Sequence, residues 1–233
     1  MSDVLMLAYI RMQLEHAQRA ARNNAEWCDA VCRAAGAPGR FEADCWVCPV
    51  RVPRYYPNLV SLAGDGARVE QVVDGLLASG LPGAWGVKDS FDQLQLASRG
   101  FACLFEAHWL WREPDTRAEH ASGWRRVESA AELRAWSLAL DAHGESPFEE
   151  ALLRDPRIAF LYLEADGQIV AGLAANLAAG VVGITNVFAF PAWAQQLTAA
   201  LARVAQLFPG AAQVCGGREP RSLRSGSRGR RCD

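Results

Sequence analysis

Lysine is nearly absent from this chain: Lys88 is the only lysine among 24 basic residues. The formal net charge is -2, so no overall positive charge attracts nucleic acid or an anionic membrane surface. The sequence also lacks the phosphate-binding loop of P-loop proteins, the nucleophile elbow of α/β-hydrolases and the paired histidines of zinc peptidases. These absences argue against those enzyme classes and against a nucleic-acid partner.

We expect no secretory leader either, because the sequence does not open with a basic region followed by an apolar run. The stretch 169–190 is long enough to cross a bilayer, but Asn176, Asn186 and the turn at Ala179-Gly180 favour two buried strands over a transmembrane helix. Seven cysteines, an odd number, favour reduced thiols over a disulfide framework. We therefore expect a cytoplasmic protein with no membrane partner.

Charge is almost missing from the segment 168–217, where Arg203 is the only charged residue. Such a segment is typical of a protein core. Its pattern predicts strands at 157–164, 169–177, 181–188 and 211–215, with a helix at 191–207 before the last strand. Asp166-Gly167 is a favoured pair for a tight hairpin turn between the first two strands.

The first half alternates helical and strand patterns. We expect helices at 3–34, 69–79 and 89–96, and strands at 45–52, 58–63, 84–88 and 101–111. After a polar segment, a short strand at 124–127 precedes a helix that Ser129 and Glu132 open as a capping box, and then a short helix at 146–154. The fold class is α/β, with a mixed central sheet flanked by helices.

We divide the chain into an N-terminal helical and α/β region at 1–120, a core at 124–217 and a basic tail at 218–233. The segment Phe101–Ala107 resembles Phe160–Ala165, each following a helix. One interpretation is that the N-terminal region is a diverged copy of the core. The other is coincidence, because a buried strand followed by an acidic residue is common.

From Trp124 onward the predicted order is strand, helix, helix, three strands, helix, strand. This order resembles the core of the GNAT-type acyl-CoA N-acyltransferase superfamily and covers 124–217. The segments 23–29 and 55–58 also look like bacterial GNAT-related proteins of unassigned role, which have an extra N-terminal region. The resemblance implies a splayed pair of parallel strands that admits acyl-CoA. It also implies a set of cofactor-binding residues: Thr185, Asn186, Val187, Phe188, Ala189, Ala192 and Trp193.

The chain departs from the family pattern in two places. The segment 189–194 has neither the glycines nor the basic residue of the family's pyrophosphate loop, and Pro191 removes one amide donor. All four tyrosines (Tyr9, Tyr55, Tyr56, Tyr162) precede the fourth core strand, whereas the family's usual acid is a tyrosine that follows it. No carboxylate lies between Asp166 and Glu219, so a general base would be Glu164, Glu149 or Glu150, or would come from the N-terminal half.

The resemblance implies an acyl-CoA-dependent N-acyltransferase that uses acetyl-CoA as co-substrate and an unidentified amine as acceptor. A backbone amide near Val187, which we expect to be buried in its strand, would stabilise the oxyanion. The alternative is a catalytically inactive GNAT-fold protein that binds a ligand or a partner. Both departures favour this alternative.

The tail carries six arginines against Glu219 and Asp233, with little that is apolar beyond Leu223. We expect it to be disordered. One interpretation is a basic arm for nucleic acid. The preferred one is a shifted reading frame in a GC-rich gene, because the family resemblance implies a further helix and strand here.

Two smaller features have alternative interpretations. Cys28, Cys32, Cys45 and Cys48 have a spacing that could hold zinc in an interaction module, but core packing is favoured for cysteines on an apolar helix, and we expect no metal. Lys88 follows a predicted strand and is either a ligand-facing ammonium or, in the favoured interpretation, a surface lysine beside a helix cap.

Overall fold

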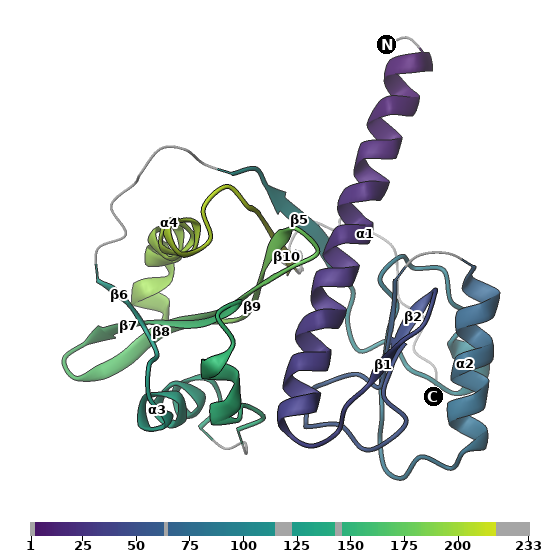
Figure 1. Cartoon of the computed structure of the whole chain (residues 1–233), viewed down its shortest axis with the longest axis horizontal. Helices are drawn as coiled ribbons and strands as arrows, with labels where there is room; N and C mark the ends of the chain where they lie inside the picture. The colour runs from purple at the N-terminus through teal and green to yellow at the C-terminus, as the bar shows by residue number, and fades with distance from the viewer. Residues whose placement is uncertain (1–2, 63–64, 115–122, 143–145, 218–233) are drawn as a thin grey trace, which may run out of the picture.

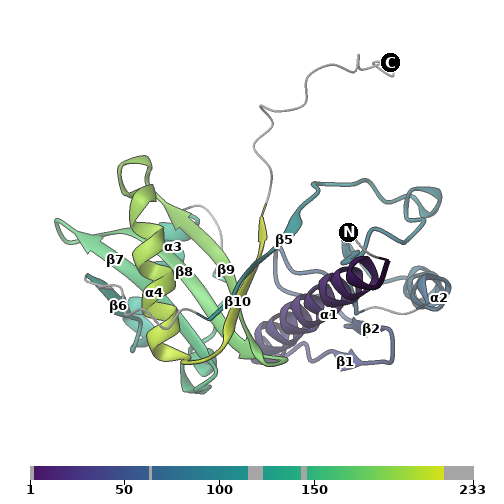
Figure 2. The same ribbon diagram turned by 90° about the horizontal axis from the view of Figure 1, so that it is seen from above.

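The computed structural model describes residues 3–62, 65–114, 123–142 and 146–217. These residues form two sheets with a long helix, α1 (Asp3–Ala34), between them (Figures 1 and 2). The predicted α/β class is therefore confirmed. The three-way division of the chain stays a prediction, and its tail lies outside the described residues.

The larger sheet has the strand order β5-β10-β9-β8-β7-β6. Only β9 and β10 run parallel, so the sheet is mixed, as the sequence predicts. Helix α4 (Leu197–Leu207) covers one face, and helix α3 (Ala130–Leu140) covers the other (Figure 2). The strands span, in sheet order, His108–Arg112, Ala212–Gly217, Val181–Ala189, Gln168–Ala178, Ile158–Ala165 and Trp124–Arg126.

Two tight hairpin turns connect the neighbouring strands β7, β8 and β9 of this sheet. Asp166 and Gly167 have φ of 50° and 74°, and Ala179 and Gly180 have φ of 51° and 70°. Positive φ at both central residues matches the right-handed twist of the flanking strands. The stretch 169–190 therefore forms β8 and β9, as predicted. Among the described residues, no helix is both long and apolar enough to span a membrane.

The smaller sheet has the order β1 (Arg40–Phe41), β2 (Cys45–Val47), β3 (Leu59–Ser61) and β4 (Val87–Lys88). Its two faces carry separate cores, because neighbouring strand residues point to opposite sides. Cys45, Val47 and Leu59 pack against helix α2 (Gly66–Ala78), and Trp46 and Val60 pack on the side of α1. Asp65 caps α2 by accepting a hydrogen bond from the Ala67 amide.

Helix α1 joins the two sheets. Cys28 and Cys32 pack into the core of the smaller sheet, while Trp27 and Val31 pack against the larger one. Asn23 is buried, and its side-chain amide donates to the carbonyl oxygens of residues 176, 178 and 181 in the β8–β9 hairpin at 3.0–3.1 Å. The N-terminal half of α1 projects beyond both sheets (Figure 1), where several large apolar side chains are exposed: Met6, Tyr9, Ile10, Met12 and Leu14.

Several predicted elements of the first half are wrong or too long. The strands predicted at 45–52 and 84–88 are regular only over β2 and β4. No helix forms at 89–96, because the Asp89 carboxylate accepts the amides of Phe91, Gln93 and Leu94 and holds an irregular loop. The strand predicted at 101–111 is regular only over β5, His108–Arg112, which pairs with β10. A segment placed in the N-terminal region thus forms an edge of the larger sheet.

Two predicted helices of the second half differ in type. The segment predicted as a helix at 146–154 is a 3₁₀ helix, η2, over Glu150–Arg154. The helix predicted at 191–207 begins as a 3₁₀ helix, η3 (Pro191–Gln196), and becomes α-helical only at Leu197. The capping box at Ser129 and Glu132 is present, as predicted.

Candidate functional site

The candidate site lies where β9 and β10 separate. The parallel pairing begins at Ala212 with Val181 and ends at Cys215 with Ile184. Beyond this point β9 continues along β8, whereas β10 continues along β5, with Gly216 opposite Trp109. The two neighbouring strands therefore diverge, and backbone that would have been paired within the sheet becomes available to a ligand.

A bulge in β9 marks the divergence. Thr185 pairs with Ala174 and Phe188 with Gly172, so Asn186 and Val187 together stand opposite one residue of β8. Asn186 has a φ of 51°, and its side-chain oxygen accepts a hydrogen bond from the Thr185 hydroxyl at 3.2 Å. Such a bulge turns the strand and redirects its side chains. The expectation that Val187 is buried is wrong, because the bulge leaves it 46% exposed.

The strand beyond the bulge is held in place by aromatic packing. The rings of Phe188 and Trp136 meet edge to face with centroids 5.3 Å apart, and the Trp136 indole donates to the Leu161 carbonyl. Both rings lie over Gly172, where a Cβ atom would come within 2.5 Å of Phe188 and 2.6 Å of Trp136. Only glycine at this position allows the two rings to rest on the sheet.

The residues after β9 do not form the pyrophosphate loop that the family resemblance implies. Pro191 opens the short helix η3, the Trp193 amide is bonded to the Phe190 carbonyl, and the Trp193 side chain packs on the core under α4. Ala192 is exposed, and no basic residue occurs between 185 and 202. The diverging strands fit an extended pantetheine arm, whereas this segment does not fit a cradle for phosphates.

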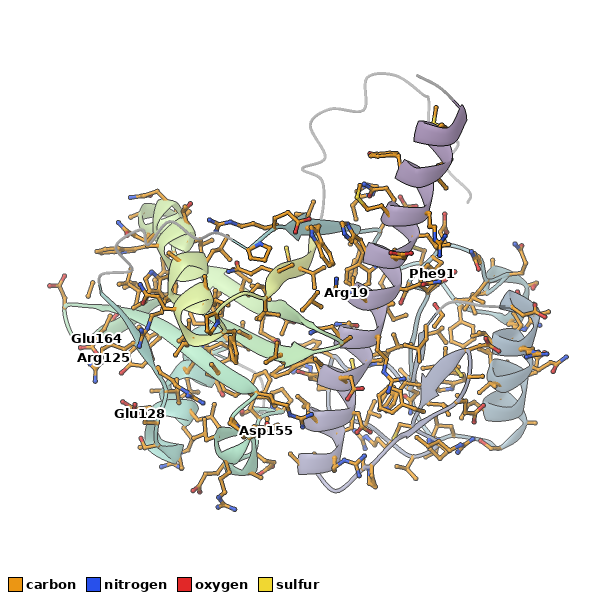
Figure 3. The ribbon with its side chains drawn as sticks, turned by 45° about the horizontal axis from the view of Figure 1, so that its top comes forward. Arg19, Phe91, Arg125, Glu128, Asp155 and Glu164 are labelled. Atoms are coloured by element: carbon orange, nitrogen blue, oxygen red, sulfur yellow. The ribbon has the colours of Figure 1, made fainter. Side chains whose placement is uncertain are left out.

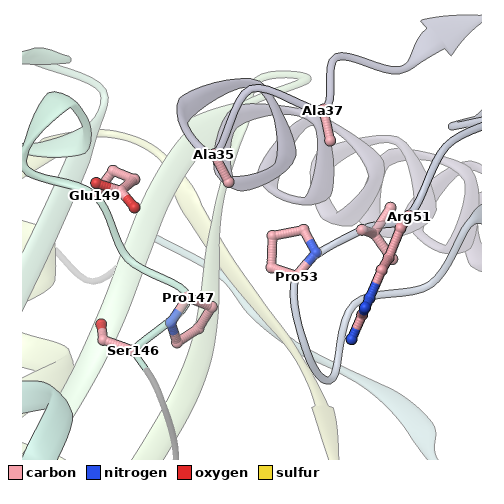
Figure 4. A pocket seen from close by; sticks show the side chains of 8 residues that line it. Ala35, Ala37, Arg51, Pro53, Ser146, Pro147 and Glu149 are labelled. Atoms are coloured by element: carbon pink, nitrogen blue, oxygen red, sulfur yellow. The ribbon is translucent and has the colours of Figure 1, made fainter.

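The three candidate carboxylates do not converge on the opening. Glu164 pairs with Arg125 at 3.5 Å at the edge of the larger sheet that is remote from α1 (Figure 3). Glu150 pairs with Arg154 within η2 at 3.6 Å. Glu149 lines a shallow hollow of about 250 Å³ together with Arg51 and Pro147 (Figure 4). A role as general base stays a prediction for each of them.

The sequence did not reveal a polar cluster around Tyr162. The Tyr162 hydroxyl donates to Glu132 at 3.1 Å, and the Arg125 guanidinium lies 5.2 Å from the centre of its ring. Burial, and then the hydrogen bond to Glu132, raise the pKa of Tyr162. Tyr162, Gly172 and Phe188 form one row across β7, β8 and β9, which places Tyr162 about 10 Å from β9. The Tyr162 backbone is therefore two strands away from β9, and its hydroxyl is bonded to Glu132 on α3.

Lys88 is a second residue that sequence reasoning placed incorrectly. Its ammonium lies 4.8 Å from the ring centre of Trp109 rather than on the open surface, and burial lowers its pKa. The Trp109 indole is fixed by donating to the Ser90 carbonyl at 3.1 Å. Lys88 is on β4 of the smaller sheet and Trp109 on β5 of the larger one, so this contact joins the two sheets. Because Lys88 and Trp109 lie far apart in the sequence, no local pattern indicated this contact.

The four cysteines at positions 28, 32, 45 and 48 do not come together in one site. Cys28, Cys32 and Cys48 belong to the core beside α1, whereas Cys45 belongs to the core beside α2. Burial raises the pKa of Cys28 to about 12 and that of Cys45 to about 11, so both are neutral thiols at pH 7. Within the described ranges, no three histidine, cysteine or acidic side chains are grouped to hold a metal ion.

Comparison with known proteins shows the fold. The chain is similar to a GCN5-related N-acetyltransferase from Kribbella flavida, with a TM-score of 0.52 and 19% identity over 82% of this chain and 84% of that one. It is also similar to a structure assigned to the GNAT family from Novosphingobium aromaticivorans, with a TM-score of 0.49 and 14% identity over 84% and 85%. No family model and no curated protein matches the sequence. The chain has a GNAT-type fold.

Proposed function

We propose that the protein is an acyl-CoA-dependent N-acyltransferase that transfers an acetyl group from acetyl-CoA to an amine. The observation that supports this proposal is the divergence of β9 and β10 at the Asn186 bulge, within a GNAT-type fold. The opening exposes strand backbone along Thr185 to Ala189, which can pair with the amide groups of a pantetheine arm. The cytoplasm, where acetyl-CoA is available, is the location that goes with this activity.

In the proposed reaction, the nitrogen lone pair of the amine attacks the thioester carbonyl carbon. Amide groups of β9 near Val187 donate to the oxygen as it becomes an oxyanion. The carbon–sulfur bond then breaks, the sulfur leaves as thiolate, and the amine loses a proton. Because β9 and β10 carry no carboxylate, that proton leaves through water or through a group outside these two strands.

The alternative is a GNAT-fold protein that binds a ligand or a partner without catalysis. The segment after β9 favours it, because η3 offers neither glycine nor a basic residue to the cofactor's phosphates. Cofactor affinity separates the two functions, since an acyltransferase must bind acetyl-CoA before any amine can react.

The test is isothermal titration of acetyl-CoA into the full chain and into a variant that fills the opening. Gly216 stands on β10 just past the last pair with β9, and a Cβ atom there would meet nothing within 4 Å. We expect the wild type to bind at micromolar strength and Gly216→Leu to bind at least about tenfold more weakly without loss of thermal stability. Gly75→Leu, on helix α2 and also without a neighbour within 4 Å, is the matched control.

The outcomes discriminate clearly. Equal binding by the wild type and Gly216→Leu would place the cofactor away from the opening. No binding by any form would favour the non-catalytic alternative. Once binding is established, formation of free CoA with a panel of amines, measured by mass spectrometry, tests the transfer step itself.

A further inference from the structure

The ammonium of Lys88 lies 4.8 Å from the ring centre of Trp109. Among the described residues this ammonium makes no hydrogen bond and no ion pair, and it is in a cation–π contact with Trp109. An ammonium has three donors and is strongly hydrated, so enclosing it in this way costs free energy that the cation–π contact offsets only in part. The side chain therefore has unused capacity to bind an anion.

The neighbouring groups do not supply that anion. An ionised Cys28 thiolate would stabilise the ammonium of Lys88. The Cys28 thiol is neutral at pH 7, however, because burial raises its pKa to about 12. Asp89 is engaged by the loop amides of Gln93 and Leu94. Asp29 is engaged by Arg33 and by the Trp46 indole.

Two further buried polar atoms at this junction have no hydrogen-bond partner in the part of the chain that the structure describes: the Ser90 hydroxyl oxygen and the Asn24 side-chain oxygen. Ser90 holds Trp109 through its carbonyl. Asn24 is on α1 one turn after Ala20, which packs in the same cluster as Trp109. The junction of α1, β4 and β5 thus holds a cation, a hydroxyl group and an amide oxygen that no described residue matches.

This junction adjoins the opening between β9 and β10. Trp109 stands opposite Gly216 in the sheet, on the face that carries Val214 and packs against α1. Gly216 adds no side chain, and the space beside it is open. A ligand that enters beside Gly216 therefore meets Trp109 first and, over its ring, the ammonium of Lys88.

We propose that Lys88 binds the carboxylate of the acyl acceptor, so that the acceptor is an amine that also carries a carboxylate, of the amino-acid class. This inference rests on the proposed function and adds the chemical class of the second substrate. The carboxylate would neutralise the ammonium over Trp109, and the amine would lie on the side of the strand opening. A phosphate of the cofactor could supply the same negative charge, and the experiment below separates the two sources.

The sequence makes the test direct, because Lys88 is the only lysine. In protein labelled with ¹³C-lysine, a single side-chain Cε resonance reports on this ammonium. The full chain is titrated, with CoA present, with the standard α-amino acids, β-alanine and 4-aminobutyrate, and in parallel with the carboxamide of each. We expect at least one acid to shift the resonance saturably, and its carboxamide, which lacks the negative charge, to leave it unmoved.

Two variants accompany the titration. Lys88→Met keeps an unbranched apolar side chain without the charge, and we expect it to bind the same acid at least about tenfold more weakly by calorimetry while binding acetyl-CoA as the wild type does. Lys88→Arg retains the charge and should restore part of the affinity. A purely structural role for Lys88 would instead lower the stability of Lys88→Met and change both affinities together.

Three other results would separate the Lys88 inference from the proposed function. Binding of acetyl-CoA with no shift from any acid would overturn the inference and leave the proposed function standing. A shift caused by CoA but not by pantetheine, which lacks the phosphates, would assign the anion to the cofactor and overturn the carboxylate. If an acid shifts the Lys88 resonance but the protein does not bind acetyl-CoA, the result would support the Lys88 site and contradict the proposed function.

Discussion

Asn23 is a buried polar residue that attaches helix α1 to the larger sheet, and its replacement gives the sharpest stability test. It is 2% exposed, and its side-chain nitrogen donates to the Asn176, Ala178 and Val181 carbonyls at 3.0, 3.1 and 3.0 Å. Asn23→Ala removes these donors and leaves buried carbonyl oxygens without them. Each unsatisfied group costs roughly 1–3 kcal/mol, so we expect a total loss of about 2–4 kcal/mol after partial relaxation.

For a chain of this size, such a loss lowers the melting temperature by roughly 5–15 °C. Thermal and urea unfolding followed by circular dichroism measure it. Gln18→Ala, five residues earlier on the same helix and without a side-chain hydrogen bond among the described residues, should change stability by less than about 0.5 kcal/mol. A change of that small size for Asn23→Ala would refute the reasoning.

The charged variant Asn23→Asp adds a pH signature. Its carboxylate would face three carbonyl oxygens, so the folded state would raise its pKa above the unfolded value. A raised pKa means that stability is retained below the unfolded pKa, about 3.9, and is lost as the pH rises through the folded value. We expect the variant to become less stable relative to the wild type between about pH 4 and pH 7, whereas Asn23→Ala should show no such trend.

Three further predictions concern single residues. Backbone hydrogen bonds from Glu128, together with the Tyr162 hydroxyl, lower the pKa of Glu132 below its ordinary 4.5, so its contribution to stability should be lost as the pH falls below that value, and Glu132→Gln should flatten this part of the melting-temperature profile. Val187→Asp should shift the free energy of unfolding by less than about 0.5 kcal/mol, because Val187 is exposed at the bulge, and a loss above 2 kcal/mol in urea unfolding would contradict its placement. Peptide mapping after brief iodoacetamide treatment should find exposed Cys103 alkylated well before buried Cys28, and equal rates would count against the raised thiol pKa.

Much of the larger sheet could be predicted from local patterns. The turn pairs Asp166-Gly167 and Ala179-Gly180 define the two hairpins, and Ser129 with Glu132 defines the start of α3, because these signals act within four residues of one another. The prediction was wrong at 89–96, where a single side chain, Asp89, competes for the amides that a helix would need.

The candidate site could be predicted only in part. The resemblance placed it on β9, but the bulge at Asn186 reversed the expected burial of Val187. The relation of Lys88 to Trp109, and of Tyr162 to Glu132, depends on elements that meet only after the chain has folded. Patterns of apolar residues predict which face of a strand is buried, but they carry no information about which polar group from a distant element approaches it.

The sequence by itself determined the hairpins, the capped helix, the near absence of charge from the segment 168–217 and the uniqueness of Lys88, because each is a property of composition or of neighbours along the chain. Only the tertiary structure decided that β5 crosses to pair with β10, that α1 lies between the two sheets, and that β9 and β10 diverge after Ile184. The pairing of β5 with β10 joins segments about 100 residues apart through backbone hydrogen bonds that are the same for every side chain, so no local pattern indicates it.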